Sequence, residues 1–111
     1  MLAAILESGE PGRLHTGLSL LVCTAAEGEP ARGLVSFGAL PVLLEGDLHG
    51  DATLRELWAT ARELPDCKLW ACSAAMDATG VDRAAVEAVL DGVSSTPRFL
   101  RETAGARLVV V

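Results

Sequence analysis

Short apolar runs alternate along this chain with segments in which apolar residues recur every three or four positions. The runs predict strands at residues 2–6, 33–37, 67–72 and 107–111. The segments between them have the period of helices that pack one face on a sheet. Strands that alternate with helices form a mostly parallel sheet, because each connection crosses back over the sheet. We therefore expect a single α/β domain over residues 1–111.

The first two helical segments carry apolar stripes that predict their buried faces. In residues 14–27 the stripe consists of Leu14, Leu18, Leu21, Val22 and Ala25. In the second segment Thr53 is the expected N-cap and Leu64-Pro65 ends the helix. Its stripe consists of Leu54, Leu57, Trp58 and Ala61. Between the two, residues 46–51 predict a polar turn, and residues 38–44 fit either a short helix with Pro41 in its first turn or an apolar loop.

The C-terminal part of the chain predicts two further helices. Residues 73–80 are small and follow the strand at 67–72 directly. Asp82 is the expected N-cap of a helix that Asp91-Gly92 closes. A last helix opens at Thr96-Pro97, because proline suits a first helical turn, and runs through residue 104 before the final strand.

Composition and charge exclude several classes of function. The chain has 9 basic and 15 acidic residues, a net charge of -6, and it is 50% hydrophobic but only 4% aromatic. Nucleic-acid binding is not expected, since phosphate contacts need clustered Lys and Arg. The composition excludes disorder, and no apolar run reaches the ~20 residues that span a bilayer. The first residues lack the pattern of a signal peptide, so we expect a cytoplasmic protein with no membrane partner.

The three cysteines and the glycines give no metal or nucleotide motif. Cys23, Cys67 and Cys72 are an odd number and lack zinc-site spacing, which favours a reducing compartment. Cys67 and Cys72 would lie roughly 16 Å apart in one strand, too far for a disulfide. Cys23 falls in an apolar helical segment and is interpreted as a core residue. No glycine pattern matches a phosphate-binding loop, so we expect neither a cofactor nor a metal.

Cys72 is the candidate nucleophile. It follows a predicted parallel strand, and ligands bind such sheets beyond the carboxyl ends of their strands. If a helix begins there, free backbone N–H groups and the helix dipole favour the thiolate. Small residues such as Ser73 leave room for a substrate. The alternative is that Cys72 is a small buried residue with a structural role, as most free cysteines are.

Other candidate residues have an ordinary structural interpretation beside the functional one. His15 could face the same crevice as Cys72 and act as a base or bind an anion, or it could be solvated. His49 has acidic neighbours but no second histidine, so it is interpreted as a turn residue. Asp77 could orient a loop or contact a substrate, or it could be a turn residue. Arg98 and Arg101 could bind an anion or lie on a solvated helix face.

Residues 69–81 and 90–93, followed by an apolar strand, resemble the DsrE/DsrF-like family. The matching features are the strand-end Cys72, Met76-Asp77 and Gly80 after it, the Asp-Gly-Val at 91–93 and the final strand. The resemblance implies a three-layer, Rossmann-like domain that assembles into homotrimers or hexamers in the cytoplasm. It implies that Cys72 accepts sulfane sulfur as a persulfide and passes it to a partner protein. Residues 38–51 are shorter than in longer relatives, which leaves the partner contacts open.

We therefore expect a sulfur carrier or sulfurtransferase-like protein that uses Cys72. Ser73, Met76, Asp77, Gly80 and His15 are the residues expected to bind the substrate or orient the loop. The alternative is a non-enzymatic oligomeric binding or accessory protein in which Cys72 is structural. A third possibility, a thiol peroxidase or redox sensor, would need a resolving thiol.

Overall fold

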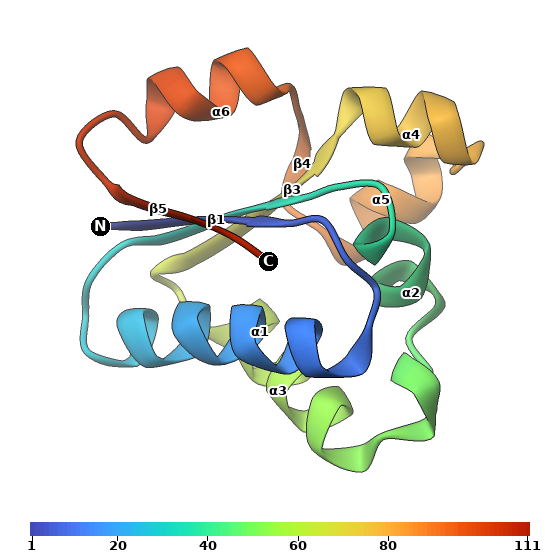
Figure 1. Cartoon of the computed structure of the whole chain (residues 1–111), viewed down its shortest axis with the longest axis horizontal. Coiled ribbons are helices and arrows are strands. Elements are labelled where there is room, and N and C mark those ends of the chain that lie inside the picture. Colours follow the sequence, from blue (N-terminus) through green and yellow to red (C-terminus); the bar gives the residue numbers. More distant parts are fainter.

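The computed structural model describes all 111 residues and contains one five-stranded, fully parallel sheet. In their order across the sheet, the strands are β4 (Gly92–Ser94), β3 (Cys67–Cys72), β2 (Ala31–Val35), β1 (Leu2–Leu6) and β5 (Arg107–Val110). Figure 1 shows the sheet nearly edge-on, with β1 running from left to right. The α/β class and the mostly parallel sheet are thus confirmed.

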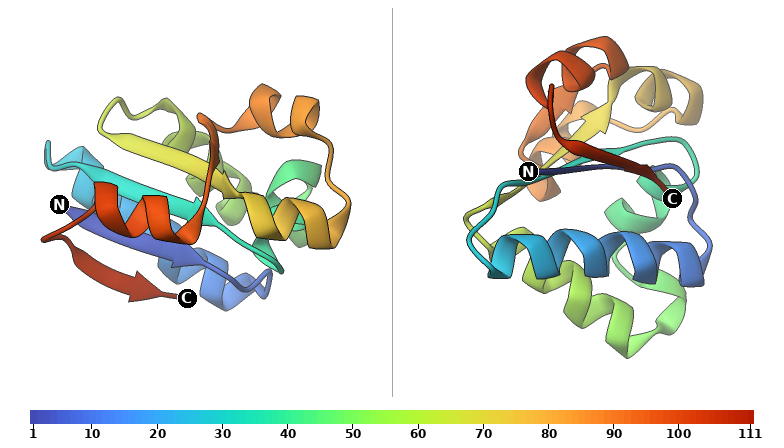
Figure 2. Two further views of the ribbon diagram at one scale, coloured as in Figure 1. Left: turned by 90° about the horizontal axis from the view of Figure 1, so that it is seen from above. Right: turned by 60° about the vertical axis from the view of Figure 1, so that its left-hand side comes forward.

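Helices cover both faces of the sheet and complete the three layers. They are α1 (Pro11–Ala26), α2 (Ala39–Glu45), the 3-10 turn η1 (Leu48–Gly50), α3 (Ala52–Glu63), α4 (Ser73–Thr79), α5 (Arg83–Val89) and α6 (Thr96–Glu102). α1 and α3 pack against one face, whereas α4 and α6 lie over the other (Figure 2). α2 lies near the carboxyl ends of the strands, where it contacts α4 and α5 (Figure 1). None of the helices combines the length and the apolar character that a membrane span requires.

α1 begins at Pro11, three residues before the expected start. The Glu10 carboxylate caps it by accepting hydrogen bonds from the backbone N–H groups of Gly12 (3.0 Å) and Arg13 (2.9 Å). These two bonds hold the pKa of Glu10 below its ordinary value, because they favour the charged carboxylate. The expected stripe is buried at Leu14, Leu18, Leu21 and Ala25, and Val22 lies at its margin.

The middle of the chain resolves the choice between helix and loop in favour of a helix. Residues 39–45 form α2, which ends at Gly46 in the left-handed region (φ 83°) that glycine adopts without strain. The expected N-cap Thr53 is wrong: the Asp51 carboxylate accepts from the Leu54 N–H at 3.1 Å and caps α3 instead. Both residue types cap helices, so the sequence pattern did not separate them.

Two strands differ from the sequence prediction. β2 begins and ends two residues earlier than expected, because Ser36 and Phe37 already form the turn into α2. β4 was not expected at all, since Asp91-Gly92 was interpreted only as a turn. It has three residues and pairs with the second half of β3, from Trp70 to Cys72. The bounds of β1 and β3 agree with the prediction.

The loops that follow β1 and β2 are packed backbone against backbone. The Ala39 N–H donates to the Glu7 carbonyl at 3.1 Å, and the Ser36 N–H donates to the Leu6 carbonyl at 2.8 Å. A Cβ atom on Gly9 would collide with the Gly38 carbonyl oxygen, and one on Gly38 would lie 2.9 Å from the Glu7 carbonyl oxygen. Both positions therefore require glycine for steric reasons.

Candidate functional site

Cys72 is the last residue of β3 and the N-cap residue of α4, with 2% of its surface exposed. Side chains two residues apart in a strand point to the same face, so Cys72 shares its face with Trp70. The Trp70 ring packs edge-on against Phe99 of α6, with the centroids 6.4 Å apart. The sulfur therefore lies on the side of the sheet that α4 and α6 cover.

Two buried serines flank Cys72 on the neighbouring strands. Ser94 pairs directly with Cys72 in the β3–β4 register. On the other side Val35 pairs with Ala71, so Ser36 is the next residue along β2 and lies beside Cys72. Both serines are buried, and the Ser94 hydroxyl makes only a long hydrogen bond of 3.5 Å to the Ser95 carbonyl. The carboxyl ends of three strands thus carry a row of small polar side chains, Ser36, Cys72 and Ser94.

The sequence prediction missed both serines of this row. Ser36 fell inside the strand expected at residues 33–37, and Ser94 belongs to β4, which was not expected. No sequence signal marks them, because Ser36 is followed by the apolar Phe37 and Ser94 follows a single apolar residue, Val93.

A helix, α4, begins directly after Cys72, which is the condition stated for its expected environment. The candidate residues on this helix differ in burial. Ser73 and Met76 are half-buried, and Met76 packs against the hydrophobic core. Asp77 is exposed on α4 and accepts no hydrogen bond from another residue. Gly80 ends α4 in the left-handed region (φ 71°), where its N–H donates to the Met76 carbonyl at 2.9 Å. Its place in the fold is that of a helix terminator.

The structure does not bring His15 to Cys72. His15 is exposed on α1, the helix that covers the opposite face of the sheet. His49 lies in η1 with φ 59°, and its Nε2 donates to the Gly9 carbonyl oxygen at 2.7 Å. No group of three His, Cys, Asp or Glu side chains is arranged to hold a metal ion. Arg98 pairs with Glu102 at 2.8 Å on the exposed face of α6.

The interpretation of Cys23 as a core residue is wrong. Cys23 is exposed on α1. The buried face of α1 passes through Leu21 and Ala25, and a residue two positions after Leu21 is turned away from it by roughly 200°. This exposure makes Cys23 open to nonspecific reagents, which affects any test of Cys72.

Cys67 is buried at the opposite end of β3 from Cys72. Burial raises the pKa of its thiol, and the negative charge of Asp91 adds to this effect, so that the pKa reaches about 11. A pKa in this range leaves Cys67 a neutral thiol at physiological pH. Cys67 is therefore not a competing nucleophile.

The raised pKa of Cys67 predicts a loss of stability at high pH. In the unfolded chain the thiol loses its proton near pH 9, whereas in the folded protein it keeps the proton to about pH 11. As the pH rises from about 9 to about 11, the free energy of unfolding should decrease by on the order of 2 kcal/mol. Denaturant titrations over this range should show the slope in a Cys23→Ser background. Cys67→Ala should lack it, and an equal slope in both proteins would contradict the assignment.

The sheet order, the two helical layers and the strand-end cysteine define a three-layer, Rossmann-like α/β protein with a cysteine at the carboxyl edge of its sheet. A solved structure of this kind, the YchN protein from E. coli, matches the chain with a TM-score of 0.65 at 14% sequence identity. The match covers 99% of this chain and 97% of that one. YchN is a DsrE/DsrF-like protein, so the expected resemblance is confirmed in the fold. No protein-family model matches the sequence, and no curated protein matches it either.

Proposed function

We propose that this protein is a DsrE-like sulfur carrier that holds sulfane sulfur as a persulfide on Cys72. The observation that carries the proposal is the place of Cys72: it ends a central strand between Ser36 and Ser94, with α4 beginning at the next residue. The likeness of the fold to YchN supports the same reading. In this proposal the transfer uses Cys72 alone and needs no second, resolving cysteine.

The transfer requires no oxidant or reductant. The Cys72 thiolate attacks the outer sulfur of a donor persulfide, R–S–SH. A new S–S bond forms to Cys72 while the donor S–S bond breaks, and the donor leaves as the thiolate R–S⁻. A persulfide is more acidic than a thiol, so the product is anionic at neutral pH and suits hydroxyl or backbone N–H donors. The Ser36 and Ser94 hydroxyls are the nearest side-chain donors in the row.

Burial of Cys72 has two consequences for this chemistry. An exposed fraction of 2% keeps bulk thiols away from a held sulfur, which would otherwise be lost by exchange. The same burial means that the carboxyl edge of the sheet must open locally before a donor can transfer sulfur to Cys72. Phe37, which follows Ser36 in the turn into α2, is a large side chain at this edge and is 44% exposed.

Intact-mass spectrometry after incubation with polysulfide tests the proposal. The exposed Cys23 would react with polysulfide nonspecifically, so the starting protein is Cys23→Ser. It should gain the mass of one or more sulfur atoms and lose it on reduction with dithiothreitol. The same gain should persist in Cys23→Ser/Cys67→Ala and be absent from Cys23→Ser/Cys72→Ala. No gain in the starting protein, or an undiminished gain without Cys72, would refute the carrier role.

Burial also favours a second candidate function, a non-enzymatic binding or accessory protein in which Cys72 is structural. Most buried free cysteines are inert, and this one packs within the hydrophobic core. The mass experiment separates the two functions, because a structural Cys72 gains no sulfur. A sulfenate on Cys72 after mild peroxide would instead indicate redox sensing.

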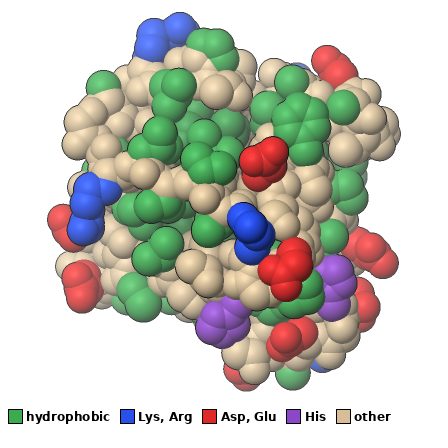
Figure 3. Space-filling view, viewed as in Figure 1, with side chains coloured by type: hydrophobic (Ala, Val, Ile, Leu, Met, Phe, Trp, Pro, Cys, Tyr) green, Lys and Arg blue, Asp and Glu red, His purple; other side chains and the backbone are tan.

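Self-association is part of the proposal. Apolar side chains gather over α6 and β5 on the face shown in Figure 3. Leu100, Leu108 and Val110 are among the exposed large apolar residues, each more than 40% exposed. β5 is an edge strand, so its outer backbone groups have no partner within the chain. A second copy of this chain would cover these groups, in keeping with the expected homotrimer or hexamer.

A further inference from the structure

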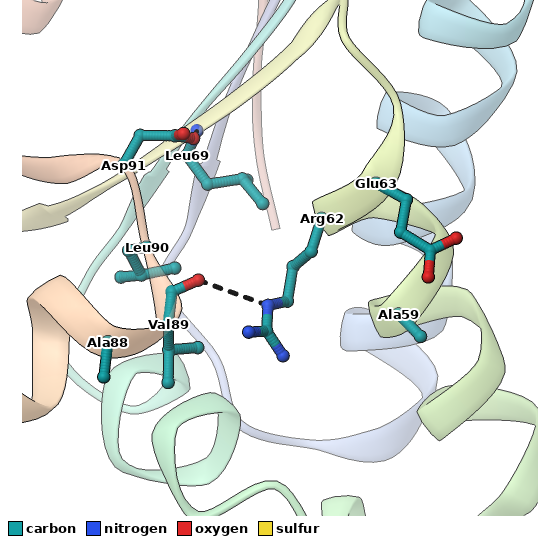
Figure 4. Close-up of a pocket in the computed structure, with 8 residues that line it drawn as sticks. All are labelled: Ala59, Arg62, Glu63, Leu69, Ala88, Val89, Leu90 and Asp91. Carbon is teal, nitrogen blue, oxygen red and sulfur yellow. Dashed lines mark hydrogen bonds between the residues drawn. The ribbon is translucent and has the colours of Figure 1, made fainter.

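A cavity of about 340 Å³ opens on the face of the sheet opposite to Cys72. Leu69 of β3 forms part of its lining, and Leu69 and Cys72, three residues apart in one strand, point to opposite faces. The remaining lining comes from α3, from the C-terminal end of α5 and from the two residues that join α5 to β4 (Figure 4). The cavity is therefore separate from the proposed sulfur site.

The cavity exists because β4 is too short to cover the whole edge of β3. β4 pairs only with Trp70 to Cys72, so the edge at Leu69 has no strand beside it. Asp91 closes this edge instead. Its N–H donates to the Leu69 carbonyl at 2.8 Å, and its Oδ2 accepts from the Leu69 N–H at 2.8 Å. The space that a longer strand would fill beside α3 stays open.

One cation, the exposed Arg62 of α3, lines the cavity without an acidic partner. Arg62 donates from Nε to the Val89 carbonyl oxygen at 3.2 Å, and its guanidinium lies 5.7 Å from the centre of the Trp58 ring. The ion pairs of the structure involve three other arginines, Arg55, Arg83 and Arg98. Figure 4 shows the guanidinium reaching across the cavity toward Val89. The Nε bond is the one hydrogen bond of the Arg62 side chain, so its two terminal nitrogens can bind a carboxylate through two parallel hydrogen bonds.

The rest of the lining restricts what this anion can be. Five of the eight lining residues are hydrophobic, which favours an aliphatic group next to the charge. Asp91 and Glu63 also line the cavity, and their negative charges disfavour a phosphate or another polyvalent anion. The volume is at the lower end of the range for ligand pockets, which limits the ligand to a small molecule.

From these features we infer that the cavity binds a small aliphatic monocarboxylate, with the carboxylate on Arg62 and the aliphatic chain against Leu69 and Leu90. A carboxylic acid without an amine and an amino acid share this chemistry. They differ in an ammonium group, for which the carboxylate oxygen of Asp91 that Leu69 does not engage is an acceptor. Binding here depends neither on Cys72 nor on sulfur.

Titration of the ¹⁵N-labelled protein with sodium isovalerate and, separately, with L-leucine tests the inference. Wild type, Cys72→Ala and the control Arg83→Gln, whose arginine pairs with Glu87 outside the cavity, should show saturable shifts around Leu69 and Val89. Arg62→Gln should bind at least about tenfold more weakly, as loss of a charged hydrogen-bonding pair implies. Ala88→Leu, which fills the cavity and keeps Arg62, should bind as weakly.

Each outcome decides the matter. Tighter binding of leucine than of isovalerate, reversed by Asp91→Asn, would identify an amino acid as the ligand class. The opposite order would identify a simple carboxylate. No saturable shift with either probe, or equal binding by wild type and Arg62→Gln, would overturn the inference and leave the sulfur-carrier proposal untouched.

Discussion

Phe99→Ala is expected to lower the free energy of unfolding by about 3–5 kcal/mol, as is typical for removing a buried aromatic ring. Phe99 is 1% exposed and is the largest of the fully buried side chains. It holds α6, a helix of only seven residues, against Trp70 of the sheet. Because α6 lies over the face that carries Cys72, the variant should also expose that thiol. Urea unfolding and the rate of Cys72 alkylation, in a Cys23→Ser background, measure the two effects.

Arg101→Ala is the control on the same helix. Arg101 is exposed and lies outside the apolar surface, so its removal should cost less than about 1 kcal/mol and leave the alkylation rate unchanged. Equal losses for the two variants would show that α6 is not held to the sheet through Phe99.

Gly9→Ala is expected to destabilise the protein by about 2–3 kcal/mol, although it adds a single methyl group. The new Cβ would lie 2.8 Å from Val42 Cγ2 and would collide with the Gly38 carbonyl oxygen. The colliding atom belongs to the backbone, which cannot move aside without breaking the hydrogen bond from Ala39 to Glu7. The loops after β1 and β2 should therefore separate at the carboxyl edge of the sheet. Thermal unfolding measures the loss.

Gly12→Ala serves as the control for this substitution. Gly12 lies in the first turn of α1, where the nearest atoms to a new Cβ are the exposed carboxylate oxygens of Glu10, at 3.3 and 3.4 Å. That side chain can adjust, and alanine favours the helix, so stability should stay within about 0.5 kcal/mol or rise. A Gly9→Ala protein as stable as this control would show that the two loops are not rigidly packed.

The central strands could be predicted from the sequence because their signal is local. β3 has six residues, all apolar except Lys68, and it lies between Pro65-Asp66 on one side and small residues on the other; its bounds agree with the prediction. β4 has three residues, only one of them buried, and starts at a glycine with φ 150°. Such a strand is defined by its pairing with β3, which is a tertiary contact and leaves no periodicity to detect.

The candidate site shows the same division. Cys72 could be found because it ends a recognisable strand. Ser36 and Ser94 could not, because their place beside it depends on the register of β2 and β4. The environment of Arg62 depends on a contact between α3 and the end of α5 at the sheet edge, and this contact cannot be predicted from residue spacing in the sequence. The exposure of Cys23 was the reverse case, in which the helical angle from Leu21 was sufficient to decide it.

The position of β1 between β2 and β5 has a consequence for synthesis on the ribosome. β2 follows β1 closely in the chain, but β5 is the last of the five strands to be made. Until residues 107–111 emerge, one side of β1 has no hydrogen-bonding neighbour, and the N–H groups of Glu7 and Ser8 lack their acceptor, the Val111 carbonyl. This pairing has a high sequence separation, so it forms late and slowly. The nascent domain thus presents β1 as an open edge, and only the addition of β5 converts β1 into an interior strand.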